Sequence, residues 1–205
     1  MRLYCDGACS GNHQTERATR RAGYGIYVAP CGAAPAVCVS HALDDADGDP
    51  PALRTSSRAE LRGMLCALDM LLHGDLPAAP QPAAVVCCDS AYVVGACNEW
   101  RHRWRAAGWR NAAAADGMRA HADVLRPIDA ALERLGARVA VRWTPAHKRA
   151  PPRDAPTDAS DEARARAREI YADWYGNAMA DALARRACGD DRPWRALRDA
   201  APRPP

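Results

Sequence analysis

The chain has 205 residues, of which 48% are hydrophobic and 26% are charged, and its formal net charge at pH 7 is +3. This length predicts one domain of about 150 residues with additional segments, rather than two full domains. The sequence has no run of about 18 apolar residues and no basic-then-apolar leader, so we expect no membrane partner and an intracellular location, in cytoplasm or nucleus. Nine cysteines without a CxxC pair indicate buried or free thiols rather than disulfides or zinc ligands.

The first 42 residues indicate three strands in an antiparallel meander. Residues 2–6 alternate in polarity up to Asp6, and residues 22–29 and 35–42 have the composition of two further strands. A turn rich in Gly, Asn and Arg at 10–21 separates the first pair, and a polar Pro/Gly loop at 44–54 follows the third strand.

A helix is predicted after this loop, with Ser57 as its N-cap and Glu60 in its first turn. Its apolar positions recur at helical spacing, at Leu61, Leu65, Leu68 and Leu72. Residues 83–89 read as a buried strand, and helical residues follow from Ala91 to about Ala107. Strand, helix and strand in this order predict parallel pairing within one sheet.

The last third of the chain predicts a helix at 120–135, a fifth strand at 136–143 and a helical segment from about Ser160 to Ala187 that is interrupted at Gly176. We expect residues 189–205 to be a disordered tail. The last helical segment carries one apolar stripe, which we expect to dock on its own domain. The stripe consists of Ala163, Ala167, Ile170, Tyr171 and Trp174.

Four acidic residues stand at the ends of short sequence motifs in these elements. Asp6 and Asp89 follow strand-like runs, whereas Glu60 and Asp181 lie in helical patterns, so all four can face one point. Carboxylates gathered at one place repel each other unless cations neutralise them, and oxygen ligands without His or Cys favour Mg²⁺ or Mn²⁺. The chemistry that this pattern favours is phosphoryl transfer on a nucleic acid.

The motifs around these residues resemble type 1 ribonuclease H, the endonuclease that cuts the RNA strand of RNA–DNA hybrids. The resemblance rests on DGACSGN at Asp6–Asn12, TSSRAE at Thr55–Glu60, CDS at Cys88–Ser90, the tryptophans Trp100, Trp104 and Trp109, and GNAMADALA at Gly176–Ala184. It implies an α/β ribonuclease-H-like fold with a five-stranded mixed sheet and helices on both faces. The catalytic domain would span residues 1–188, with a basic protrusion near 99–110 and an insertion near 149–175.

The resemblance also implies the roles of individual residues. Asp6, Glu60, Asp89 and Asp181 would hold two Mg²⁺ ions, for which Mn²⁺ can substitute, while water attacks and leaves 5′-phosphate and 3′-hydroxyl ends. His147 matches a loop histidine that assists proton transfer or product release, a role that suits near-neutral titration.

Substrate contacts follow from the same resemblance. The protrusion, in which four arginines oppose one glutamate, would grip the DNA strand, with Trp100 and Trp104 sharing a face toward deoxyribose. Trp109 is interpreted as the core of the protrusion. Ser56 and Ser57 stand where the family usually has amides, which puts the strictness for hybrids in question. The full set of implied substrate-binding residues is Asn12, Arg54, Thr55, Ser56, Ser57, Tyr92, Trp100, Arg101, Trp104, Arg105, His121 and Asn177.

Two alternatives stay open at this point: a catalytically silent hybrid-binding or polymerase-associated module, and another nuclease of the same fold such as a resolvase. Four intact carboxylates argue against the first, and the basic tryptophan segment argues against the second. We expect a monomer without an obligate protein partner. The chain begins almost at its first strand, so we expect no N-terminal hybrid-binding module and low processivity.

Overall fold

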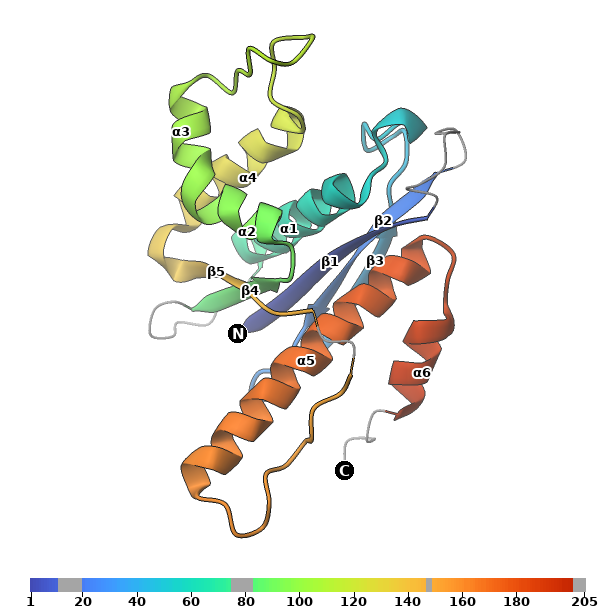
Figure 1. Cartoon of the computed structure of the whole chain (residues 1–205), viewed down its shortest axis with the longest axis vertical. Helices are drawn as coiled ribbons and strands as arrows, with labels where there is room; N and C mark the ends of the chain where they lie inside the picture. The colour runs from blue at the N-terminus through green and yellow to red at the C-terminus, as the bar shows by residue number, and fades with distance from the viewer. Residues whose placement is uncertain (11–19, 75–82, 147–148, 201–205) are drawn as a thin grey trace.

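The computed structural model describes residues 1–10, 20–74, 83–146 and 149–200 (Figure 1). Its centre is one five-stranded sheet with the order β3-β2-β1-β4-β5. The first three strands pair antiparallel, and β1, β4 and β5 pair parallel, as the sequence predicted. The strands are β1 Arg2–Ser10, β2 Arg21–Val28, β3 Val37–Ala42, β4 Ala84–Cys88 and β5 Val139–Trp143.

Helices cover both faces of this sheet. Figure 1 shows α5 crossing one face, whereas α1 and α4 lie on the other. The main helices are α1 Ser56–His73, α4 Ala122–Leu135 and α5 Asp161–Ala187. Between β4 and α4, α2 Ala91–Gly95, a π-helical turn at Ala96–Trp100 and α3 Arg101–Ala106 form one helical stretch, close to the predicted 91–107. None of the helices in the described ranges is long and apolar enough to cross a membrane.

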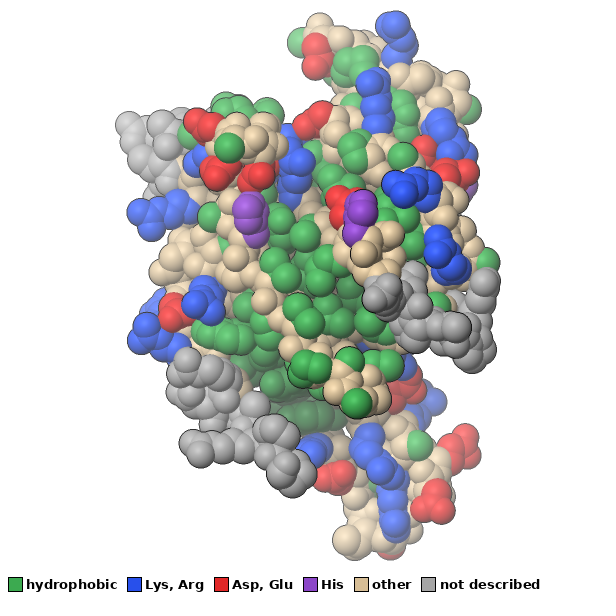
Figure 2. Space-filling model, turned by 180° about the vertical axis from the view of Figure 1, so that it is seen from behind, with side chains coloured by type: hydrophobic (Ala, Val, Ile, Leu, Met, Phe, Trp, Pro, Cys, Tyr) green, Lys and Arg blue, Asp and Glu red, His purple; other side chains and the backbone are tan. Residues whose placement is uncertain are grey.

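Alternation along β1 divides the core between the two faces. Leu3 and Cys5 are buried with the apolar residues of α1 and α4, while Tyr4 points to the α5 side and packs with Met179 and Leu183. Burial of these large side chains is the dominant stabilising contribution, at about 1.5–3 kcal/mol for each. Seen from behind, hydrophobic side chains gather at the middle of the molecule, with charged ones around them (Figure 2).

Helix α1 begins two residues earlier than predicted. Thr55 is its N-cap, because its Oγ1 accepts a hydrogen bond from the backbone N–H of Arg58 at 3.2 Å, and Ser56 is already helical. The prediction that Ser57 caps this helix was therefore wrong. The hydroxyl of Thr55 satisfies a backbone donor that the first helical turn leaves free.

Helix α5 is continuous through Gly176, so the predicted interruption is absent. The ring of Tyr4 explains the glycine: a Cβ added at Gly176 would meet the Tyr4 Cζ atom at 2.5 Å. Tertiary packing against β1 thus outweighs the roughly 1 kcal/mol that a glycine costs in a helix interior.

The carboxylate of Asp173 joins α5 to two strands of the sheet. Asp173 accepts hydrogen bonds from Tyr4 Oη at 2.8 Å, Arg142 Nη2 at 2.7 Å and Arg2 Nη1 at 3.1 Å. Arg2 also pairs with Glu169 at 2.6 Å. These contacts fix the middle of the helix against β1 and β5.

The apolar stripe of α5 docks only in part. Tyr171 and Trp174 are half-buried and lie with ring centroids 5.5 Å apart, but Ala163 is exposed and Ile170 is 43% exposed. The N-terminal half of α5 extends past the sheet (Figure 1). The prediction that the whole stripe docks was therefore wrong for Ala163 and Ile170.

The segment after α5 is also helical, which corrects the expectation of a disordered tail. Helix α6 spans Arg192–Ala200, and its Trp194 and Leu197 pack on the cluster around Tyr27. The guanidinium of Arg186 lies 5.5 Å from the centre of the Trp194 ring. An amphipathic helix with an aromatic anchor thus docks where we expected an unstructured chain.

Candidate active site

The four acidic residues come together beside the inner strands β1 and β4. Asp6 lies on β1 and Asp89 directly follows β4, and the parallel register Tyr4↔Cys87 places them side by side. Glu60 reaches the same place from α1, because Gly7 lets that helix approach: an added Cβ there would lie 2.8 Å from the Cα of Glu60.

Three of these carboxylates line one cleft of about 390 Å³. Asp181 enters it from α5, opposite Asp6 and Asp89. The remaining lining residues are Ala146, Asn177, Ala178 and Arg185. The predicted convergence of strand-end and helical carboxylates is therefore present in the structure.

The surroundings of Asp6 disfavour its charged form. Burial raises the pKa of Asp6 well above its usual range, and the carboxylates of Asp89 and Asp181 raise it further. The backbone N–H of Gly7 donates to Asp6 Oδ1 at 2.7 Å and opposes this rise. Without a cation, the site therefore favours a protonated Asp6.

The pKa values of the two helical carboxylates, Glu60 and Asp181, are also raised. Burial raises the pKa of Glu60, with a hydrogen bond from Ser90 acting against it. Burial also raises the pKa of Asp181, and the nearby guanidinium of Arg185 opposes the shift. Perturbed acids gathered in one cleft are typical of functional sites.

Two hydrogen bonds hold Asp89 from both sides. Asn177 Nδ2 donates to Asp89 Oδ2 at 3.1 Å, and Trp143 Nε1 donates to the Asp89 backbone carbonyl at 3.0 Å. Asn177 Oδ1 is buried and has no hydrogen-bond partner in the described part of the molecule. An unpartnered oxygen beside carboxylates suits a site that receives a cation.

The donor set fits a hard divalent metal ion. All four acidic residues offer oxygen, and neither His nor Cys lines the cleft among the described residues. Within those same residues, no group of three His, Cys, Asp or Glu side chains is arranged closely enough to hold a metal ion. The fit to a metal therefore rests on the chemistry of the oxygen donors that face the cleft.

The family model of RNase H matches residues 1–189 of this chain. The chain belongs to the ribonuclease H family. The Ribonuclease H of Janthinobacterium sp. (strain Marseille) is 31% identical over 146 residues, which cover 71% of this chain and 82% of that protein. The Ribonuclease H of Anaeromyxobacter dehalogenans (strain 2CP-C) is 35% identical over 99 residues, and the match spans about half of each chain, 48% of both.

Solved structures agree on the ribonuclease H fold. The solution structure of the PFV RNase H domain superposes with a TM-score of 0.56 at 21% identity, covering 92% of this chain and 93% of that one. The crystal structure of LC9-RNase H1 gives 0.55 at 21% identity, with 93% and 72% covered. The five-stranded mixed sheet predicted from the sequence is thus that of the family.

Two residues that the ribonuclease H motifs single out, Asn12 and His147, lie outside the described residues. Ala146, which immediately precedes His147, lines the carboxylate cleft.

A second pocket of about 460 Å³ lies beside the start of α4 and is rich in cationic side chains. His121 lines it in a left-handed conformation, with φ 61°, and burial lowers the pKa of its imidazole. Arg58, Arg119 and Arg126 also line it, with Asp116 and Asp123 as counter-charges. His121, one of the residues predicted to bind substrate, thus lines a pocket.

The other predicted residues of this neighbourhood are engaged within the protein. Arg54 donates to the Asp49 carbonyl at 2.9 Å and pairs with Asp45 at 2.9 Å, and Thr55 caps α1. Ser56 and Ser57 are half-buried in the first turn of α1. Arg54 and the Thr55 hydroxyl therefore have structural partners before any substrate binds.

The aromatic residues of the protrusion form a row. Ring centroids are 6.1 Å apart between Tyr92 and Trp100, 5.6 Å between Trp100 and Trp104, and 6.4 Å between Trp104 and Trp109. Trp109 is buried in the core, as interpreted from the sequence, but Trp104 is buried too, at 5% exposure, with Arg119 over its ring. Trp104 cannot present its face to deoxyribose in this structure, which corrects its predicted role.

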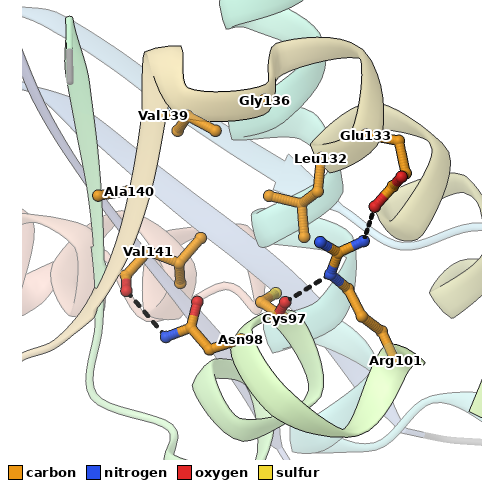
Figure 3. A pocket seen from close by; sticks show the side chains of 9 residues that line it. All are labelled: Cys97, Asn98, Arg101, Leu132, Glu133, Gly136, Val139, Ala140 and Val141. Atoms are coloured by element: carbon orange, nitrogen blue, oxygen red, sulfur yellow. Dashed lines mark hydrogen bonds and ion pairs between the residues drawn. The ribbon is translucent and has the colours of Figure 1, made fainter. Parts of the chain in front are cut away.

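The two arginines assigned to the DNA strand point toward α4 instead. Arg101 Nη1 lies 2.7 Å from Asp129 and 2.5 Å from Glu133, and Arg105 Nη1 lies 3.2 Å from Asp129. Figure 3 shows Arg101 reaching Glu133 across a pocket of about 350 Å³ at the outer edge of β5. These ion pairs hold α3 on α4.

Two other arginines of the protrusion are available. Arg103 and Arg110 are exposed, and neither has an ion-pair partner among the described residues. The sequence analysis counted them in the charge of the segment but did not assign them. Long-range pairing with α4, which local patterns do not reveal, decides which arginines remain free.

Proposed function

We propose that this chain is a metal-dependent endonuclease that hydrolyses the RNA strand of RNA–DNA hybrids, leaving 5′-phosphate and 3′-hydroxyl ends. The observation that carries the proposal is the cleft in which Asp6, Asp89 and Asp181 meet, with Glu60 beside them. Membership of the ribonuclease H family supports it. A foamy viral protease–reverse transcriptase of similar fold, with a TM-score of 0.56, is described in complex with an RNA/DNA hybrid.

The carboxylates would hold two Mg²⁺ ions, for which Mn²⁺ can substitute, and these ions would supply charge stabilisation for the attacking and leaving oxygens. The protein's own contribution is to fix the carboxylates before substrate arrives. The amide of Asn177 orients Asp89, the indole of Trp143 holds the Asp89 backbone, and the Gly7 N–H orients Asp6. Such preorganisation avoids reorganisation of the site during the reaction.

Substrate placement would come from the surfaces on either side of the cleft. The cationic pocket around His121, Arg119 and Arg126 would receive a phosphate of the DNA strand, and Arg103 and Arg110 would meet phosphates farther along. His147, next to the cleft residue Ala146, would assist proton transfer to the leaving group.

The proposal is tested by cleavage of labelled RNA–DNA hybrid, duplex RNA, duplex DNA and single-stranded RNA, each with and without Mg²⁺. Only the hybrid should be cut, on its RNA strand, and only with the metal present. Asp89→Asn should abolish cleavage and keep hybrid binding, because the amide preserves volume but removes the charge. Asp69→Asn, which changes an exposed carboxylate on α1, is the matched control and should cleave normally.

The alternatives predict different results. A silent binding module would bind the hybrid without any metal-dependent product. A resolvase-type nuclease would cut DNA junctions or duplexes instead. Turnover of Asp89→Asn within tenfold of the parent enzyme would remove the carboxylate cleft from the reaction.

A further inference from the structure

Among the described residues that line the carboxylate cleft, Arg185 carries the one basic side chain. It lies one helical turn after Asp181 on α5, and its Nη1 is 4.0 Å from Asp181 Oδ2. The side chain is 44% exposed, so the guanidinium is open to anything that enters the cleft. A cation placed so close to a carboxylate competes with metal ions for that carboxylate, unless something restrains it.

Asp190 provides this restraint. Its Oδ2 accepts a hydrogen bond from Arg185 Nη2 at 2.7 Å, which is much shorter than the separation between Arg185 and Asp181. The Arg185 guanidinium is thus hydrogen-bonded to Asp190, beyond the end of α5, whereas it only lies near Asp181 in the cleft.

The end of α5 is built to bring Asp190 back to Arg185. Gly189 has φ +94°, a left-handed conformation that glycine adopts without strain. The chain then turns so that the Asp190 N–H donates to the Arg185 carbonyl at 3.0 Å. Arg192, at the start of α6, pairs with the other side of Asp190 at 2.9 Å and fixes its carboxylate.

We propose that Arg185 is a phosphate-binding residue of the cleft and that Asp190 is its positioning residue, holding the guanidinium away from Asp181. The inference rests on the proposed function, since the phosphate is that of the RNA strand. A guanidinium carries five N–H donors, and the pair with Asp190 leaves others free to reach a non-bridging phosphate oxygen. The arrangement lets one residue attract the phosphate while Asp181 stays available to a metal ion.

The test separates the two roles by measuring metal and hybrid binding independently of cleavage. Mn²⁺ binding to the hybrid-free protein is measured by calorimetry, and binding of a fluorescent RNA–DNA hybrid is measured in EDTA by anisotropy. Asp190→Asn should weaken Mn²⁺ binding roughly twofold, the factor expected in a water-like dielectric when the released Arg185 closes on Asp181 from 4.0 Å to about 2.8 Å. Arg185→Gln should leave Mn²⁺ binding as tight as in the parent or tighter.

The same Arg185→Gln variant should weaken hybrid binding about tenfold and reduce the salt slope of log K by about one unit, as loss of one phosphate contact does. The double variant, Asp190→Asn with Arg185→Gln, should recover the Mn²⁺ affinity that Asp190→Asn alone loses, because the released guanidinium is gone. Asp191→Asn is the matched control: it removes a neighbouring carboxylate that pairs with Arg186 and Arg195, and both affinities should be unchanged.

Unchanged Mn²⁺ affinity in Asp190→Asn, or no recovery in the double variant, would overturn the positioning role. Unchanged hybrid affinity and salt slope in Arg185→Gln would overturn the phosphate-binding role. If the proposed function itself is wrong, the result is different: the parent protein should then bind no Mn²⁺ at the cleft, and Asp181→Asn should not change the measured Mn²⁺ binding. Melting temperatures within a degree or two of the parent identify variants whose fold is intact.

Discussion

Replacing Gly25 with alanine should damage catalysis without touching any catalytic residue. Gly25 lies on β2 directly opposite Asp6 in the antiparallel register, and α5 crosses it at the turn that carries Asp181. An added Cβ would lie 2.5 Å from the backbone nitrogen of Ala184 and closer still to the carbonyl oxygen of Ala180. Backbone atoms cannot rotate away, so the helix itself must move.

The required movement can be worked from the geometry. Ordinary contact begins at 3.4 Å, so α5 must retreat by at least 0.9 Å (3.4 − 2.5) from β2. Overpacking of this kind costs typically 1–3 kcal/mol of stability. Displacement of Asp181 from Asp6 by about 1 Å should also lower the rate of hybrid cleavage by about 10²-fold.

The assay is single-turnover cleavage of RNA–DNA hybrid, together with thermal unfolding followed by circular dichroism. Gly63→Ala is the control, because its Cβ on α1 meets nothing closer than the Tyr24 Cβ at 3.1 Å, and it should lose much less activity. If Gly25→Ala unfolds at the parent temperature and cleaves at the parent rate, the close approach of α5 does not position the site, and the reasoning fails.

Three further results are expected. In EDTA at pH 7, Asp6→Asn should raise the melting temperature. Because the pKa of Asp6 is raised, the folded state binds more protons than the unfolded state, so wild-type stability falls as pH rises above about 3.8. Melts from pH 4 to pH 8 should therefore show that the difference in melting temperature between variant and parent shrinks toward acid pH. Trp104→Ala should lower the free energy of unfolding by about 3–5 kcal/mol in a denaturant titration while leaving the salt slope of hybrid binding unchanged, since its ring is buried. Asp173→Asn should lower both stability and cleavage, because Arg142 and Arg2 lose their shared carboxylate, and a variant that melts and cleaves like the parent would contradict this.

The clustering of the four carboxylates was predictable because their placement follows from local rules. Asp6 on β1, Asp89 directly after β4 and Glu60 near the start of α1 come together once β1 and β4 pair in parallel. The same reasoning predicted the mixed sheet and the helices on its two faces.

Predictions about individual surfaces were weaker, for a physical reason. Helical spacing correctly placed Trp100 and Trp104 on one face, but it cannot say whether that face meets the core or solvent. Arg101 was assigned to DNA because its partners, Asp129 and Glu133, lie on another helix far along the chain. Gly176 suggested a break in α5 because the Tyr4 ring that fills the space beside it comes from the other end of the chain.

The unequal packing of α5 has a practical consequence for experiments. Its anchor at Asp173 holds the half that carries Asp181, whereas Ala163 is exposed on the half that extends past the sheet. At 1.5 Å per helical residue, Ala163 and Asp181 are about 27 Å apart along the same continuous helix. A fluorophore on an Ala163→Cys thiol would therefore report its distance to a dye on the hybrid while leaving the cleft unmodified. The exposed Cys31 and Cys38 and the partly exposed Cys9, Cys66 and Cys188 must be replaced first.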